Sequence, residues 1–149
     1  MRESIGGTWI FSLVIIFIVL FSGYLAVSVN YSKAFKVKNG IVAIIEENEG
    51  LNSKAEGEIR SYLNSMGYYV YGSCNTNASG DEKETGYEPK GSKHKYCIKK
   101  SIPEGNSTIP KAYYTVKVFF RLDLPVRGDL FTFPISGETK AVYFASDKN

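Results

Sequence analysis

Residues 8–30 decide the architecture of this chain, and they read TWIFSLVIIFIVLFSGYLAVSVN without a single charged side chain. At a rise of 1.5 Å per residue, a helix of about 20 apolar residues spans a hydrocarbon layer of about 30 Å. Trp9 lies at one end, and Tyr24 and Tyr31 lie toward the other, where aromatic membrane anchors are expected. The stretch is longer than the apolar part of a cleaved secretory signal, which is the alternative. We therefore expect one retained membrane-spanning helix in contact with lipid.

The features that bear on the orientation of this helix disagree with one another. Lys33, Lys36 and Lys38 follow it directly, and their charge favours a cytoplasmic position for the C-terminal side. Cys74 and Cys97 favour the opposite side, because a disulfide forms outside the cytoplasm. Short strands rich in Tyr and Phe are also typical of surface-exposed modules. We expect a single-pass protein of the cell membrane with an extracytoplasmic C-terminal head.

The overall composition excludes several functional classes. The chain has 149 residues, and 18 basic against 15 acidic side chains give a net charge of +3, too small and scattered to indicate nucleic-acid binding. The only histidine, His94, lies in a polar stretch where we expect it to be exposed, which argues against a Ser-His-Asp triad. A Ser–Lys pair stays open by counting, but no such pair stands out. We expect no enzyme activity, cofactor, metal site or small-molecule substrate.

The acidic residues form two small groups, at 46–49 and 81–84. Neither group has the alternating carboxylates, the glycine and the terminal glutamate of a calcium-binding EF-hand loop. We expect both groups to be solvated. The first group also complements the lysines that follow the apolar stretch, which would favour contact between neighbouring copies.

Helical periodicity continues after the apolar stretch, because apolar residues recur at spacings of three and four within residues 31–50. This amphipathic extension contains Asn39-Gly40, which predicts a kink or break. Gly50 is a stop signal. We therefore expect the helix to continue beyond the membrane as an amphipathic extension over residues 31–50.

A second helix is predicted to begin at Ser53, because Ser53 and Glu56 match the capping-box pattern. Gly67 follows as a C-terminal cap. The apolar face of this helix consists of Ala55, Ile59, Leu63 and Met66. We expect this face to pack against a sheet.

Strand-like sequence dominates after Gly67. The segments with β-prone or alternating patterns are 68–71, 96–98, 112–126, 130–135 and 139–145. Pro134 restricts its strand to a sheet edge or bulge, and residues 127–129 and 136–138 have turn composition. Together these patterns predict an antiparallel meander and an α+β fold, with one head spanning residues 51–149.

A polar stretch, residues 75–96, separates the two cysteines. It contains no large aliphatic side chain and cannot bury enough surface to order itself. We expect an exposed loop that a Cys74–Cys97 disulfide closes at its base, the alternative being two free thiols in a cytosolic domain. The absence of a CxxC motif argues against a redox-active pair.

Tyrosine is unusually frequent, with 11 in the chain. Aromatic side chains dominate protein interfaces, although core filling explains them equally well. The candidate interaction face consists of Tyr68, Tyr69, Tyr71, Tyr113 and Tyr114.

The layout of residues 1–50, MRESIGGTWIFSLVIIFIVLFSGYLAVSVNYSKAFKVKNGIVAIIEENEG, resembles that of type IV pilin-like proteins, most closely TadE-like minor pilins. A tail at 1–7, an apolar helix, an amphipathic extension and a small head follow one another. The resemblance implies cleavage by a prepilin peptidase between Gly7 and Thr8, with Ser12 where family members carry a glutamate. It also implies a non-enzymatic subunit of a bacterial surface filament or its assembly system. Its partners would be other pilin-like or secretion-system subunits, or copies of itself. The alternative is a membrane-tethered accessory or binding domain of a cell-envelope or secretion complex that never enters a fibre.

Overall fold

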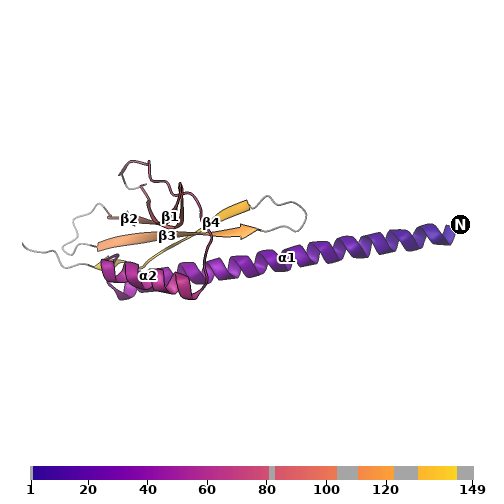
Figure 1. The fold of residues 1–149 in the computed structure, drawn as a ribbon, viewed down its shortest axis with the longest axis horizontal. Coiled ribbons are helices and arrows are strands. Elements are labelled where there is room, and N and C mark those ends of the chain that lie inside the picture. Colours follow the sequence, from indigo (N-terminus) through magenta and orange to yellow (C-terminus); the bar gives the residue numbers. More distant parts are fainter. Residues whose placement is uncertain (1, 81–82, 104–110, 123–130, 144–149) are drawn as a thin grey trace, which may run out of the picture.

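The computed structural model describes residues 2–80, 83–103, 111–122 and 131–143, and it has the expected α+β architecture (Figure 1). Two helices precede an antiparallel sheet. Their bounds are α1 (Arg2–Glu47), α2 (Ser53–Ser65), β1 (Thr85–Lys90), β2 (Lys93–Ser101), β3 (Lys111–Leu122), β4 (Phe131–Glu138) and β5 (Val142–Tyr143). Figure 1 shows both helices on one side of the sheet, with the N-terminal half of α1 projecting away from the head.

Helix α1 is uninterrupted for 46 residues, which corresponds to a length of about 69 Å. The predicted kink or break at Asn39-Gly40 is therefore wrong. Gly40 faces α2, where a Cβ atom would overlap the ring of Tyr62. The hydroxyl of Tyr62 also donates to the carbonyl of Lys36 at 3.1 Å. The glycine therefore allows the two helices to approach closely instead of breaking α1.

The ends of α2 differ in how well the sequence predicts them. Asn52, and not Ser53, is the N-cap, because its side-chain oxygen accepts a hydrogen bond from the backbone N–H of Ala55 at 2.8 Å. At the other end, Gly67 has a φ of +57° and its N–H donates to Asn64. The next N–H donates to the carbonyl of Leu63, which completes a Schellman motif. The cap predicted at Gly67 is confirmed.

The sheet is antiparallel, as predicted; β1-β2-β3-β4 follow one another as a meander, and β5 pairs with β3. Residues 96–98 lie within β2, residues 112–122 lie within β3, and Pro134 lies on the edge strand β4. The turn predicted at residues 136–138 is wrong, because β4 continues through them. The break comes at Thr139, whose hydroxyl accepts from the N–H of Tyr114 at 3.0 Å. The turn predicted at residues 127–129 lies outside the described residues.

Two further predictions, both for the part of the chain between α2 and the end of the predicted loop, are wrong. Residues 68–71 do not form a strand, and the neighbouring Gly72 makes only an isolated backbone bridge to His94 of β2. The expected loop at 75–96 contains β1 and the start of β2, which form a hairpin. The rings of Tyr87 and Tyr96 stack across this hairpin at 5.0 Å. Pairing with the buried strand β2 therefore orders a segment that could not order itself.

The core lies between the helices and one face of the sheet. From α1 it takes Val37, Ile41 and Ile45, from α2 Ile59 and Leu63, and from the sheet Tyr96, Ile98, Val116 and Val118. The three α1 side chains are each four residues apart, so they lie along one stripe of the helix, which faces the sheet. The C-terminal half of α1 is thus an integral part of the head, and the N-terminal half extends from it as a rod (Figure 1).

Candidate functional site: an apolar rod and the base of the head

The N-terminal half of α1 exposes an apolar surface on all sides. Every side chain from Gly6 to Ser22 is exposed, including Trp9, whose exposed fraction is 72%. This helix is long and apolar enough to cross a membrane, and none of its most apolar part is buried within the described structure. Contiguous apolar surface of this extent on a soluble protein marks contact with a membrane or another protein.

The residues predicted as membrane anchors occupy two different environments. Trp9 and Tyr24 are exposed on the rod. Tyr31 lies where the rod meets the head and contacts the ring of Phe120 edge-on, with ring centroids 5.8 Å apart. The candidate processing residues Gly7 and Thr8 are exposed in the second turn of α1.

A chain of aromatic rings joins the rod to the edge of the sheet. Tyr31 stacks on Phe35 at 6.3 Å and contacts Phe120, which stacks on Phe133 at 5.4 Å. Phe131 follows at 6.5 Å from Phe133. All of these rings except Phe120 are exposed. The chain lies where β3 ends and β4 begins, next to the part of α1 that leaves the head (Figure 1).

Two open grooves lie beside this aromatic chain. The first, of about 310 Å³, is lined by Lys33 and Asn30 of α1, by residues 67–70 and by the end of β3. The second, of about 440 Å³, is lined by Tyr69, Val70, Tyr71, Lys90, Lys93, Arg121 and Thr132. Arg121 lines both grooves. Basic and aromatic side chains therefore gather at this end of the head.

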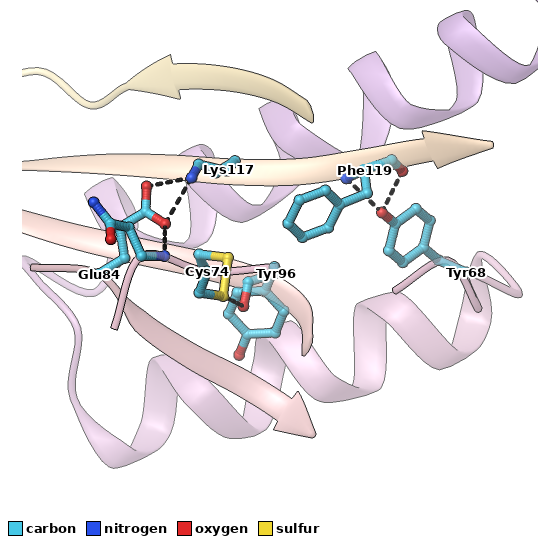
Figure 2. Close-up of a disulfide and its surroundings, with 8 residues drawn as sticks. Tyr68, Cys74, Glu84, Tyr96, Lys117 and Phe119 are labelled. Carbon is cyan, nitrogen blue, oxygen red and sulfur yellow. Dashed lines mark hydrogen bonds and ion pairs between the residues drawn. A yellow bond between two sulfur atoms is a disulfide. The ribbon is translucent and has the colours of Figure 1, made fainter. Parts of the chain in front are cut away.

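The five tyrosines predicted as an interaction face do not form one. Tyr68 and Tyr114 are buried, so these two assignments are wrong. The hydroxyl of Tyr68 donates to the carbonyl of Phe119 and accepts from its N–H at 2.8 Å (Figure 2). Burial raises the pKa of Tyr68 to about 12, an effect that the hydrogen bond with Phe119 partly opposes.

The other three tyrosines are at least partly accessible, but they lie at opposite ends of the sheet. Tyr69 is exposed and Tyr71 is half-buried, and both line the second groove. Tyr113 is half-buried and pairs with Ser101, near the other end of β3. Adjacent tyrosines therefore have different roles, which the composition of the segment did not reveal.

The Cys74–Cys97 disulfide is present, with the two Cα atoms 5.7 Å apart. Glu84 lies beside it and accepts hydrogen bonds from Lys117 at 2.6 Å and from the N–H of Asn75 at 2.7 Å (Figure 2). Its side chain is only 12% exposed, so the expectation of a solvated carboxylate is wrong for this residue. The ion pair and the disulfide together fasten the segment after residue 74 to the sheet.

This cluster is also the arrangement that most resembles a metal site. The ligand atoms of Cys74, Glu84 and Cys97 all lie within 4.8 Å of one another. The two sulfur atoms are bonded to each other, however, and the carboxylate pairs with Lys117. Cysteine binds a metal as the thiolate, which a disulfide lacks, so we assign the oxidised pair a structural role.

Two other polar groups are less accessible than predicted. His94 is half-buried, its ring lies against Gly86, and its Nδ1 has no hydrogen-bond partner among the described residues. In the acidic group at 46–49, the carboxylate of Glu46 accepts from the N–H of Lys140 at 2.7 Å. Glu46 therefore holds the segment between β4 and β5 against α1, and Glu47 and Glu49 are exposed as predicted.

Comparison of the chain with models of protein families, with curated proteins and with solved structures gave no match.

Proposed function

We propose that this protein is a non-enzymatic, pilin-like subunit, of the TadE-like type, of a bacterial surface filament or its assembly system. In this proposal residues 8–30 anchor it in the cell membrane and the head is extracytoplasmic. One observation carries the proposal: a single continuous helix has one half in the core of the head and the other half apolar and exposed on all sides.

The two halves of α1 have separate physical roles. Val37, Ile41 and Ile45 are fully buried, so the helix cannot leave the head without unfolding its core. Burial of each large apolar side chain of the rod stabilises the buried state by about 1.5–3 kcal/mol. Because a helix satisfies its own backbone hydrogen bonds, this rod can be buried in lipid or in a bundle of identical helices. A subunit that moves from a membrane into a fibre needs this property.

The disulfide supports an extracytoplasmic head. Cys74 and Cys97 form a bond that persists in oxidising compartments and is rare in the bacterial cytoplasm. The lysines at 33, 36 and 38 favour the opposite orientation. Protease treatment of intact spheroplasts tests the orientation directly, because only an extracytoplasmic head is accessible before the membrane is opened.

The second candidate is a membrane-tethered accessory domain of a cell-envelope or secretion complex that never enters a fibre. The observation that favours it is Ser12, which stands where the pilin-like proteins that this layout resembles carry a glutamate. Both candidates share the membrane anchor, and they differ in processing and in release from the cell.

The two candidates are separated by shearing native cells and measuring the intact mass of the protein in the sheared and membrane fractions. A sheared chain that begins at Thr8 supports the filament subunit. A full-length chain confined to membranes supports the tethered domain, and release from membranes by alkaline carbonate contradicts both.

A pair of matched variants makes the processing test specific. A Cβ atom at Gly7 or at Gly23 would meet no other atom within 4 Å, so both positions accept a larger side chain. Gly7→Leu should block removal of the first seven residues, whereas Gly23→Leu should leave it unchanged. Cleavage of the Gly7→Leu chain at the same bond would contradict a peptidase that recognises this glycine.

A further inference from the structure

We propose that the end of the head nearest the rod binds anionic phospholipid headgroups, so that the head rests on the membrane from which α1 emerges. This basal surface consists of four basic side chains and three exposed rings: Lys33, Lys90, Lys93, Arg121, Tyr69, Phe131 and Phe133. The inference rests on the proposed membrane anchor, and it adds a second, electrostatic contact with lipid.

The antiparallel register brings these residues to one end of the sheet. Lys90 pairs with Lys93 across the β1–β2 turn, and Arg121 at the end of β3 pairs with Thr132 at the start of β4. Lys93, Arg121 and Thr132 line the same groove, so the turn lies beside the end of β3. In Figure 1, β3 points along the rod, and this end of the sheet therefore faces the N-terminal half of α1.

The position of the span sets the height of the basal surface above the membrane. If residues 8–30 cross the hydrocarbon layer, Lys33 lies about 4.5 Å farther along the helix, at the level of the lipid headgroups. The Lys33 ammonium group donates to the carbonyl of Gly67 at 3.0 Å and lines the first groove. The groove therefore opens at the depth where lipid phosphates are found.

The charge of the basal surface is complementary to lipid phosphate. Among the described residues that line the two grooves, none is acidic. Two described carboxylates of the sheet have basic partners of their own: Glu84 pairs with Lys117, and Glu88 pairs with Arg60 and Lys95. Glu138 lies at the far end of β4 from Thr132. Basic residues close to an anionic membrane are attracted to it, and the attraction falls off within a Debye length.

The aromatic residues fit the same location. Phe131 and Phe133 are 56% and 42% exposed on the edge strand, although each is a large apolar ring. They continue the chain of rings that begins at Tyr31 on α1. Aromatic side chains are favoured at the membrane–water interface. The rings would therefore enter the interface where the basic side chains meet the phosphates.

The test uses the full chain reconstituted in vesicles of phosphatidylcholine alone or mixed with phosphatidylglycerol. A fluorophore sensitive to its surroundings is attached to Ser92→Cys in the β1–β2 turn, and in a separate chain to Ser53→Cys at the start of α2. Both positions are exposed, and neither native cysteine is free to react. We expect nitroxide-labelled headgroups to quench the Ser92→Cys label in the mixed vesicles and to leave the Ser53→Cys label unquenched.

A matched pair of double variants measures the electrostatic contribution to the docking of the head on the membrane. Lys90→Gln with Lys93→Gln should lower the ratio of docked to undocked heads about 25-fold, because each lysine near an anionic surface contributes about 5-fold. The same change at Lys54 and Lys140, two exposed lysines away from the basal surface, should leave the ratio unchanged. High salt should reproduce the loss in the parent chain.

Alkaline carbonate extraction of the same vesicles tests the membrane anchor separately from the binding of headgroups by the basal surface. If the protein stays with the lipid but the Ser92→Cys label is never quenched, the basal surface does not bind headgroups and the anchor stands. Equal quenching in phosphatidylcholine alone, insensitive to salt and to the lysine variants, also overturns the electrostatic docking. If carbonate releases the protein, the membrane anchor and the docking surface are both wrong.

Discussion

Replacing Gly40 by alanine should destabilise the head, whereas the same replacement at Gly57 should stabilise it. Both glycines lie inside helices, where alanine is more favourable than glycine by about 1 kcal/mol. A Cβ atom at Gly57 would meet nothing within 4 Å, but one at Gly40 would overlap the ring of Tyr62. The two substitutions are therefore chemically identical and differ only in the contact between α1 and α2.

The expected magnitudes follow from these two effects. Overpacking of a well-packed contact costs about 1–3 kcal/mol. At Gly40 this cost is offset by the gain in helix propensity of about 1 kcal/mol, so the net loss is up to about 2 kcal/mol. In a Tyr62→Ala background the overlap is absent, and Gly40→Ala should then stabilise the head by about 1 kcal/mol, as Gly57→Ala does.

The free energy of unfolding of the head can be measured by guanidinium denaturation in detergent micelles, followed by the near-ultraviolet circular dichroism of the tyrosines. The four chains of the Gly40–Tyr62 cycle and the Gly57→Ala control are compared under one condition. If Gly40→Ala stabilises the parent chain as much as Gly57→Ala does, the close approach of the two helices is refuted. A coupling of zero in the cycle would refute it independently.

Three other predictions concern the head. Replacing Cys74 and Cys97 together by alanine should lower the free energy of unfolding by about 3 kcal/mol, because the disulfide closes a chain segment with a separation of 23 residues. Denaturation of the parent chain with and without reductant should show the same difference in the free energy of unfolding. Tyr68→Phe should cost about 1–3 kcal/mol at neutral pH, because a backbone N–H and a carbonyl lose their buried partner. The pKa of Tyr68 is about 12 in the folded chain, against 10 for an unfolded tyrosine. Between pH 10 and 12 only the unfolded chain releases this proton, so the parent chain loses stability as the pH rises through this range. In a pH series, the Tyr68→Phe variant should show a shallower loss of stability. Glu84→Gln should weaken the attachment of the segment after Cys74, seen as faster hydrogen exchange at the N–H of Asn75; unchanged exchange would contradict this role.

Local sequence patterns predicted the features that depend only on neighbouring residues. The apolar run at 8–30, the alternation along β3 and the cap at Gly67 each have a period or a residue type that specifies one local structure. The pairing of the two cysteines was predictable because only one intramolecular disulfide is possible. These features include the rod, which is one half of the candidate site.

Several of the expectations that failed depend on residues distant in the chain. Gly40 predicts a break unless the ring of Tyr62 is known to lie against it. Residues 85–90 are too polar to order themselves, and only pairing with β2 makes them a strand. Tyr68 and Tyr69 are neighbours of the same type, yet the first is buried against β3 and the second is exposed.

Hydrophobic periodicity, turn residues and the cysteine count act within a few residues or by simple pairing, so they were enough to predict one long apolar helix followed by an α+β head with a disulfide. That α1 runs unbroken from the rod into the core could be seen only in the folded chain. The same holds for the gathering of Lys33, Lys90, Lys93 and Arg121 at the base of the head. These residues come from three parts of the chain, and strand register together with helix packing, which no local pattern encodes, brings them to one end.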